Sequence, residues 1–233
     1  MKIAIMQPYF FPYIGYFQLM SAVDEFVVYD NIEFTKKGWI NRNRILVNGK
    51  DAYITLPLKN AKDVLDVRDR CLAETWPREK KKILNRIVES YRKAPQFSAV
   101  YPWIEKCITS EETNLFKFIL GSIVAVKGYL EIKTPLVVSS TIPVDHELKA
   151  EKKVMAICKA RKSDTYINPL GGVQLYNKED FKGEGVELFF LKTHDFRYGQ
   201  FNNDFLPQLS IIDVMMFNPL KVIHEQLFKM ELI

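Results

Sequence analysis

The chain opens on the stretch KIAIMQPYFFPYIGYF, residues 2–17. Its first five residues form an apolar run that predicts a short buried strand. Pro8 and Pro12 then fix their own backbone angles and bias the residues before them toward extended conformations. The aromatic segment between them is therefore expected to be a stiff, shaped loop. Gly15 follows where a helix is expected, near 14–22, and permits a close approach of the backbone there.

Outward from this stretch, the chain alternates between apolar strands and helices. A second apolar run at 25–29 follows so soon after the first that a βαβ crossover with parallel pairing is expected. Later segments continue the pattern, with strands expected at 136–139, 165–167 and 186–191, helices at 147–161 and near 178–181, and two closing helices. This alternation predicts an α/β fold with a mainly parallel sheet and flanking helices.

The middle of the chain has a different sequence pattern. Asn48-Gly49 is a strong hairpin signal between the apolar runs 44–47 and 52–56. A further strand is considered at 64–72, and residues 76–130 have helical periodicity throughout. We therefore predict a single α/β domain over 1–233, in which 39–130 form a hairpin-plus-helical insertion or subdomain.

Composition limits the classes of function. The 233 residues are 48% hydrophobic and 26% charged, with a net charge of +5, so the chain is expected to be globular and to favour anionic ligands. The charge is too modest and scattered to indicate nucleic-acid binding. The apolar stretch 118–126 is far shorter than the roughly 20 residues that span a bilayer. We predict no membrane insertion.

Three cysteines without a CxxC pair, Cys71, Cys107 and Cys158, favour a reducing, cytoplasmic location over a disulfide framework. No spaced cluster of histidines and cysteines indicates a metal site. The sequence identifies no cofactor and does not define the oligomeric state.

Polar residues follow each predicted strand, where ligands bind in open parallel sheets. Gln7 follows the first strand and Asp30 the second. Either could bind a ligand, satisfy a buried polar group or cap a helix. Later strands are followed by Ser139, Ser140, Thr141, Asn168, Thr193, His194 and Asp195, for which ordinary loop polarity is the simpler explanation.

The segment WINRNR at 39–44 is a second candidate. In an extended strand Arg42 and Arg44 would share one face, and Asn41 and Asn43 the other. Two guanidinium groups on one face suit a phosphate or carboxylate. The alternative is a charged hairpin edge that discourages strand aggregation.

Asp213 is a third candidate, because it lies in an apolar helix where an unpaired carboxylate would be costly to bury. An arginine such as Arg42 or Arg44, a backbone amide or a substrate amine would each serve as its partner. A buried carboxylate with a raised pKa could act as a base, and a structural ion pair is the competing interpretation. His194 is the other candidate base.

The sequence closely resembles the WbqC-like protein family. The resemblance rests on the opening stretch and on ordered short motifs: VVYD at 27–30, Trp39, NRNR at 41–44, Leu56-Pro57, FLP at 205–207, LSIID at 209–213 and Asn218. It adds Tyr9, Gly15 and Trp39 to Gln7, Asp30, Arg42, Asn43 and Arg44 as expected substrate-binding residues. The topology also invites comparison with nucleotidyltransferase-like folds, although Tyr13-Ile14-Gly15-Tyr16 lacks the two histidines of their first loop.

Members of this family are associated with surface-polysaccharide biosynthesis of the O-antigen type, and glycyl or other aminoacyl transfer to an amino sugar has been suggested for them. The resemblance therefore implies a transferase with a small-molecule or nucleotide-sugar substrate. A non-catalytic ligand-binding or scaffold protein of the same pathway is the rival hypothesis.

Overall fold

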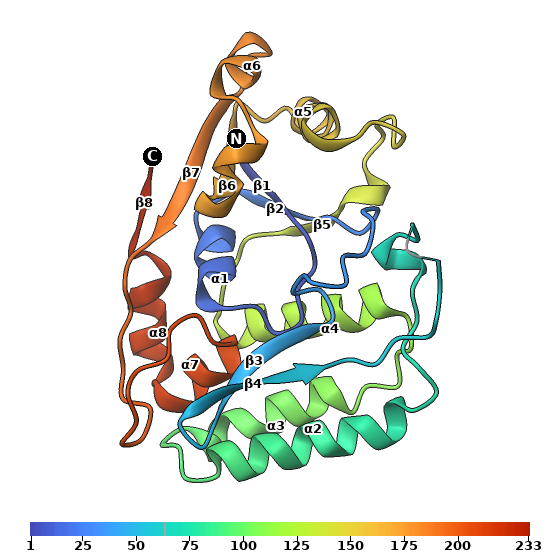
Figure 1. The fold of residues 1–233 in the computed structure, drawn as a ribbon. Helices are drawn as coiled ribbons and strands as arrows, with labels where there is room; N and C mark the ends of the chain where they lie inside the picture. Colours follow the sequence, from blue (N-terminus) through green and yellow to red (C-terminus); the bar gives the residue numbers. More distant parts are fainter. Residues whose placement is uncertain (63) are drawn as a thin grey trace.

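The computed structural model describes residues 1–62 and 64–233. Its centre is a six-stranded sheet with the order β5-β2-β1-β6-β7-β8 (Figure 1). The strands are β1 (Lys2–Met6), β2 (Glu25–Val28), β5 (Leu136–Val138), β6 (Thr165–Pro169), β7 (Glu187–Thr193) and β8 (Met230–Leu232). The first five pair in parallel, and β8 runs antiparallel to β7. The predicted α/β fold with a mainly parallel sheet is confirmed.

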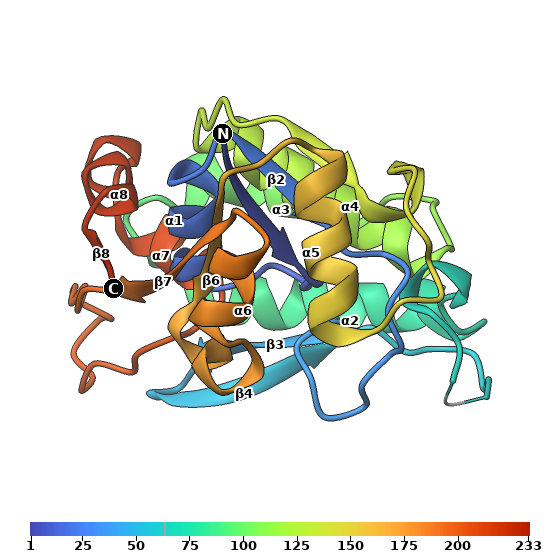
Figure 2. The ribbon, with the colours of Figure 1, turned by 90° about the horizontal axis from the view of Figure 1, so that it is seen from above.

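Both faces of the sheet are buried, because successive strand residues enter different hydrophobic cores. Ile3 and Ile5 of β1 pack in the core that includes α5 and α6, whereas Ala4 packs in the larger core. Figure 2 shows α1 and α5 on opposite sides of β1. The flanking helices are α1 (Ile14–Ser21), α4 (Leu115–Tyr129), α5 (Ala150–Ala160), α6 (Lys178–Gly183), α7 (Ile211–Phe217) and α8 (Leu220–Leu227).

A β-hairpin and helices join β2 to β5. Strands β3 (Arg42–Val47) and β4 (Lys50–Thr55) pair antiparallel, as predicted. Asn48 and Gly49 both have positive φ, at 49° and 76°, as a tight hairpin turn requires. The hairpin lies beside α2 (Trp76–Tyr91) and α3 (Phe97–Ile108) in Figure 1. Side chains from these elements belong to the same core as the sheet, and the domain division stays a prediction.

The strand considered at 64–72 was wrong. This segment contains a short 3₁₀ helix, η1 (Val67–Asp69), and makes only isolated bridges on either side of it. Its hydrogen bonds change partner at each step, from Val67 N–H to Ile32 O and from Arg68 N–H to Asp30 O. Among the described residues, no neighbouring strand therefore offers the regular ladder that an extended segment needs.

The strand order places a crevice at one edge of the sheet. Strands β2 and β5, which follow β1 in the sequence, lie on one side of it, and the later strands β6 and β7 lie on the other side. Loops after β1 and β6 therefore leave in opposite directions, and open α/β sheets bind ligands at such a reversal point. Two more 3₁₀ helices follow strands at this edge, η2 (Ser139–Thr141) after β5 and η3 (Leu170–Leu175) after β6.

Among the helices of residues 1–62 and 64–233, none has both the length and the apolar character that a membrane crossing requires. The three cysteines are free, and burial raises the pKa of the Cys107 thiol to about 11 and that of the Cys158 thiol to about 12. Both thiols are therefore protonated at neutral pH.

Candidate functional site

The loop between β1 and α1 has a fixed, strained shape. Phe11 adopts φ of 42°, a left-handed conformation that a bulky residue rarely takes without support. Asn43 supplies that support, because its Nδ2 donates to the carbonyl oxygens of Phe10 (3.0 Å) and Phe11 (2.8 Å). Ser210 Oγ also donates to the Phe11 carbonyl, at 2.8 Å. Two segments far away in the sequence thus determine the shape of this loop.

Backbone hydrogen bonds join the same three segments. Ser210 N–H donates to the Arg44 carbonyl at 2.8 Å, and Ile211 N–H donates to the Pro12 carbonyl at 3.0 Å. Ser210 is also the N-cap of α7, where its Oγ accepts from Ile212 N–H. The start of α7, the hairpin and the first loop therefore form one rigid wall.

A cavity of about 590 Å³ lies against this wall, at the carboxyl ends of β1, β6 and β7. It occupies the reversal point of the strand order, between the loops that follow β1 and β6. Its lining includes aromatic, basic and amide residues: Tyr9, Pro12, Tyr13, Trp39, Asn43, Arg44, Pro169, Leu170, Gly171, Leu191, Lys192, Thr193 and Gln208.

The charged residues in that lining, Arg44 and Lys192, are both basic. Arg44 Nη1 lies 3.2 Å from Asp51 Oδ2, but its Nε is buried and has no hydrogen-bond partner among the described residues. Lys192 Nζ lies 3.6 Å from Glu231 in an exposed ion pair, which contributes little. The cavity is thus suited to an anion.

The two tyrosines of the first loop remain neutral donors at the cavity. Desolvation raises the pKa of both Tyr9 and Tyr13 above the usual value of 10.0, and the pKa of Tyr9 is raised further by Tyr13. At neutral pH each phenol keeps its proton. Their rings can stack against a ligand while their hydroxyl groups remain available for hydrogen bonds.

Gly15 controls the position of Tyr13. A Cβ at Gly15 would lie 2.4 Å from the Tyr13 ring, so Gly15→Ala must displace that ring from its position in the cavity wall. Because alanine favours helix by about 1 kcal/mol over glycine, we expect little loss of thermal stability but weaker ligand binding. Gly121→Ala in α4 is the matched control, since its Cβ would meet nothing within 4 Å. Equal ligand affinity in the two variants, measured by titration calorimetry, would contradict this role.

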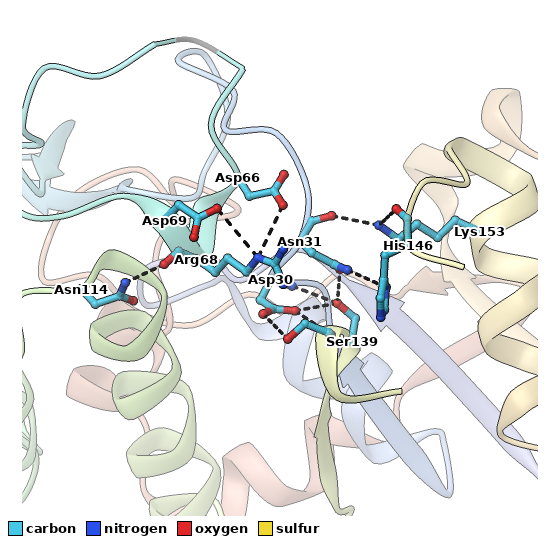
Figure 3. A network of polar contacts seen from close by, with 10 residues as sticks. Asp30, Asn31, Asp66, Arg68, Asp69, Asn114, Ser139, His146 and Lys153 are labelled. Atoms are coloured by element: carbon cyan, nitrogen blue, oxygen red, sulfur yellow. Dashed lines mark hydrogen bonds and ion pairs between the residues drawn. The ribbon is translucent and has the colours of Figure 1, made fainter. Parts of the chain in front are cut away.

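A separate polar network joins the carboxyl ends of β2 and β5 (Figure 3). Asp30 is buried, and its Oδ1 accepts from Ser140 N–H at 2.9 Å while its Oδ2 accepts from Ser140 Oγ at 2.7 Å. Ser139 Oγ lies 2.8 Å from Asp30 Oδ1 and 2.6 Å from Asn31 Oδ1. Asp30 therefore fastens the two strand ends to one another.

Lys153 of α5 extends this network. Its buried ammonium donates to the carbonyl oxygens of Asn31 (3.2 Å) and His146 (3.1 Å) and lies over the Tyr29 ring. Desolvation lowers the pKa of Lys153. Asn31 Nδ2 lies 2.9 Å from His146 Nδ1, and Figure 3 shows these two side chains pointing toward one another. These contacts tie α5 and the preceding loop to the sheet, and none of these residues lines the cavity.

The predicted substrate-binding residues separate into two groups. Tyr9, Trp39, Asn43 and Arg44 line the cavity. Four others do not line it. Gly15 lies behind Tyr13, and Asp30 belongs to the network described above. Gln7 is half-buried and its carbonyl accepts from the Tyr16 hydroxyl, whereas Arg42 donates to the carbonyl oxygens of Lys37 and Gly38. Ligand contact by these four stays a prediction.

Asp213 is completely buried, and its partners differ from those expected. Its Oδ1 accepts from the Tyr198 hydroxyl and from Gln200 Nε2, both at 2.7 Å, and its Oδ2 accepts from the Tyr91 hydroxyl at 2.8 Å. These donors are two phenol hydroxyls and a side-chain amide, so neither the expected arginine nor the expected backbone amide is among them. Desolvation raises the pKa of Asp213, although the three hydrogen bonds oppose that shift. A role as base stays a prediction.

His194 lies at the end of β7 and is exposed to solvent. It follows directly after Lys192 and Thr193, which line the cavity. Of the two predicted bases, His194 is therefore the one whose side chain can reach solvent beside the cavity.

A family model described as the WbqC-like protein family matches residues 7–225. The chain belongs to this family. The WbqC-like chain is also 28% identical over 220 residues to the uncharacterized protein Rv1507c of Mycobacterium tuberculosis (strain ATCC 25618 / H37Rv), covering 92% of each chain. No solved structure matches at a significant level, and the nucleotidyltransferase analogy stays a prediction.

Some cavity residues of this WbqC-like chain were missed from the sequence. Tyr13 lies within the opening motif, so its ring could have been nominated with Tyr9. Lys192 was missed because β7 was predicted to end at 191, and it ends at Thr193. Gln208 has φ of 57° and follows a proline, but no local pattern points to a ligand.

Proposed function

We propose that this WbqC-like protein is a transferase that binds a nucleotide sugar in the cavity beside Arg44. The observation that carries the proposal is the pairing of two cationic side chains, Arg44 and Lys192, with three aromatic rings in one cavity at the reversal point of the sheet. Its volume of about 590 Å³ lies within the usual range for small-molecule sites.

The chemistry of the lining fits the parts of such a ligand. The guanidinium of Arg44 and the ammonium of Lys192 are suited to a diphosphate, because both offer charged donors to phosphate oxygens. The rings of Tyr9, Tyr13 and Trp39 offer stacking surfaces for the base and the sugar. The tyrosine hydroxyls and the Asn43 amide add hydrogen-bonding groups of the kind that fix orientation.

The finer proposal is aminoacyl transfer to the amino group of the nucleotide-linked sugar, in surface-polysaccharide biosynthesis. The amine would attack the carbonyl carbon of an activated aminoacyl ester or thioester and form an amide, and the alcohol or thiol would leave. The base that takes the amine proton would be His194, which is exposed beside the cavity, or Asp213. We assign the reaction to the cytoplasm, in keeping with the three free cysteines.

A non-catalytic binding protein is the second candidate. It is favoured by the three neutral partners of Asp213, which occupy this carboxylate within the fold. The two functions differ in turnover. A His194→Ala variant that keeps nucleotide-sugar affinity but loses turnover would support the enzyme, whereas a binding protein has no turnover to lose.

The test of the anionic site compares Arg44→Gln with Arg42→Gln. Both variants remove one positive charge from the same face of the hairpin, but only Arg44 lines the cavity. A hydrogen bond to a charged group is worth about 1.5–3 kcal/mol, so Arg44→Gln should weaken binding by roughly 10- to 100-fold. Arg42→Gln should change it little.

The measurement is a thermal-shift screen against nucleotides, UDP-N-acetylglucosamine, coenzyme A derivatives and amino acids, followed by titration calorimetry of each hit. Stabilisation by a nucleotide sugar that is lost in Arg44→Gln supports the proposal. Equal losses in both variants would reject a specific Arg44 contact, and no shift with any nucleotide would reject the substrate class.

A further inference from the structure

The positive charge of the chain is segregated rather than scattered. Residues 76–93, which form α2 and its C-terminal end, contain seven basic and two acidic side chains. Residues 34–50 contain five basic side chains and no acidic ones. Each segment therefore has a net charge of +5, which leaves a net charge of −5 on the rest of the chain.

The structure places these two segments side by side. Arg86 is exposed on α2, and its Nη1 donates to the Tyr53 carbonyl oxygen of β4 at 2.8 Å. On the buried side, the Tyr91 hydroxyl accepts from Leu46 N–H of β3, also at 2.8 Å. Figure 1 shows the hairpin lying along α2. The positive charge of both segments is therefore gathered in one region of the molecule.

The solvent-facing side of α2 is almost uniformly basic. Glu79 is half-buried and offsets part of the charge through ion pairs with Arg78 and Lys82, but such exposed pairs contribute little. Apart from Asn85 and Glu89, every exposed residue between 78 and 93 is basic. We call these six residues the basic face: Arg78, Lys81, Lys82, Arg86, Arg92 and Lys93.

The shape of the basic face suits an extended partner. None of its residues lines the cavity beside Arg44. α2 has 16 residues, so the face is about 24 Å long. Protein interfaces bury apolar or aromatic anchors at their centres, whereas the exposed positions from 78 to 93 are all charged or amide. The expected partner is therefore an extended negative surface.

Nucleic acids fit this region poorly. The major groove of a DNA duplex is about 12 Å wide and admits one helix or one two-stranded ribbon, whereas α2 lies directly beside the hairpin. Single strands bind by stacking bases on free aromatic rings. Trp39 and Tyr53, the exposed rings of this region, stack on each other, and a guanidinium group lies over each of them. Neither ring offers a free face.

We propose that the basic face docks the protein on a membrane surface rich in anionic lipids, without insertion into the bilayer. Lipid phosphates attract lysine and arginine side chains through charge alone, and clusters of about four to eight such residues are characteristic of lipid-binding surfaces. The net negative charge of the rest of the chain turns the basic face toward the membrane. This docking does not depend on the proposed function.

The experiment is co-sedimentation of the full chain with vesicles of phosphatidylcholine alone, and with vesicles of phosphatidylcholine and phosphatidylglycerol in equal parts. The test variant combines Lys81→Gln, Lys82→Gln and Lys93→Gln, because glutamine has a helix propensity close to that of lysine. The matched control removes three exposed lysines in and around α5, a helix that packs in the other hydrophobic core. Its substitutions are Lys149→Gln, Lys152→Gln and Lys162→Gln.

The unchanged protein should bind the anionic vesicles, and its binding should weaken as salt is added. Each charge removed from the basic face should weaken binding by about fivefold, so the test variant should bind about 100-fold more weakly. The control should bind like the unchanged protein. Equal losses in the two variants, equal binding to phosphatidylcholine alone, or no binding to the anionic vesicles would overturn the proposal.

Two further measurements separate this proposal from others. A DNA duplex that binds the unchanged protein more tightly than the anionic vesicles do would overturn lipid as the partner. Titration calorimetry with UDP tests the proposed function independently, because none of the three lysines of the test variant lines the cavity. The test variant should therefore lose vesicle binding and keep its UDP affinity, and a parallel loss of both would overturn a separate docking face.

Discussion

Replacing Asp213 with alanine is expected to lower the free energy of unfolding by about 3–5 kcal/mol, because the hydroxyls of Tyr91 and Tyr198 and the amide of Gln200 lose their common acceptor. These groups come from α2 and from the segment before α7, so one substitution loosens both. Urea denaturation followed by circular dichroism measures the loss. A decrease below about 1 kcal/mol would show that the cluster is not structural.

Asp213→Asn is the matched variant, because it keeps the shape and an oxygen acceptor. Burial raises the pKa of Asp213 above 3.8, so the unfolded chain releases this proton at a lower pH than the folded protein does. The stability that depends on this proton is therefore greatest below pH 3.8 and falls as pH rises through the folded pKa. Relative to the parent, Asp213→Asn should gain stability over that interval. A constant difference with pH would contradict the raised pKa.

Asn43→Ala is expected to have the second-largest effect, on both stability and binding. The substitution leaves the buried carbonyls of Phe10 and Phe11 without this donor and Arg44 N–H without its acceptor. We expect a loss of about 2–4 kcal/mol in the free energy of unfolding. Because Phe11, at positive φ, would keep only the hydrogen bond from Ser210, the cavity wall should relax and ligand affinity should fall by roughly tenfold.

Ser210→Ala is the comparison for this prediction. It removes one hydrogen bond to Phe11 and the cap of α7, and leaves the two bonds from Asn43 in place. It should therefore cost less stability and less affinity than Asn43→Ala. The same urea denaturation and UDP titration rank the two variants, and the reverse order would assign the main support of the loop to α7.

The elements predicted well from sequence are those specified by local chemistry. The opening apolar run, the two prolines and the Asn-Gly turn each limit the backbone over a few residues, and the corresponding strand, loop and hairpin are confirmed. Strand β8 was missed because Met230–Leu232 is too short to show periodicity. Its pairing with β7 is a tertiary contact that local sequence does not specify.

Side-chain partners were harder to predict than elements. The alternation of residues along a strand predicted that Arg42 and Arg44 share one face of the hairpin. In the structure, Arg42 lies over the Tyr53 ring and Arg44 over the Trp39 ring. The alternation could not predict that Arg42 binds backbone carbonyls while Arg44 lines the cavity. The carbonyls of Lys37 and Gly38 point toward Arg42 because of the conformation of the preceding turn, which strand periodicity does not predict. Likewise, the partners of Asp213 come from residues 91, 198 and 200, and no spacing in the sequence connects them.

The dependence of the first loop on Asn43 and Ser210 has a consequence for biosynthesis. Ser210 lies 199 residues after Phe11, so the loop acquires its second support only after the long intervening stretch has been synthesised. Contacts between residues so far apart in the sequence form late, because closing the loop between them costs conformational entropy before the contact stabilises the fold. A nascent chain that ends before α7 could hold β1, α1 and the hairpin and still lack a competent cavity. Ligand binding would then report that α7 has been synthesised and has packed against the loop.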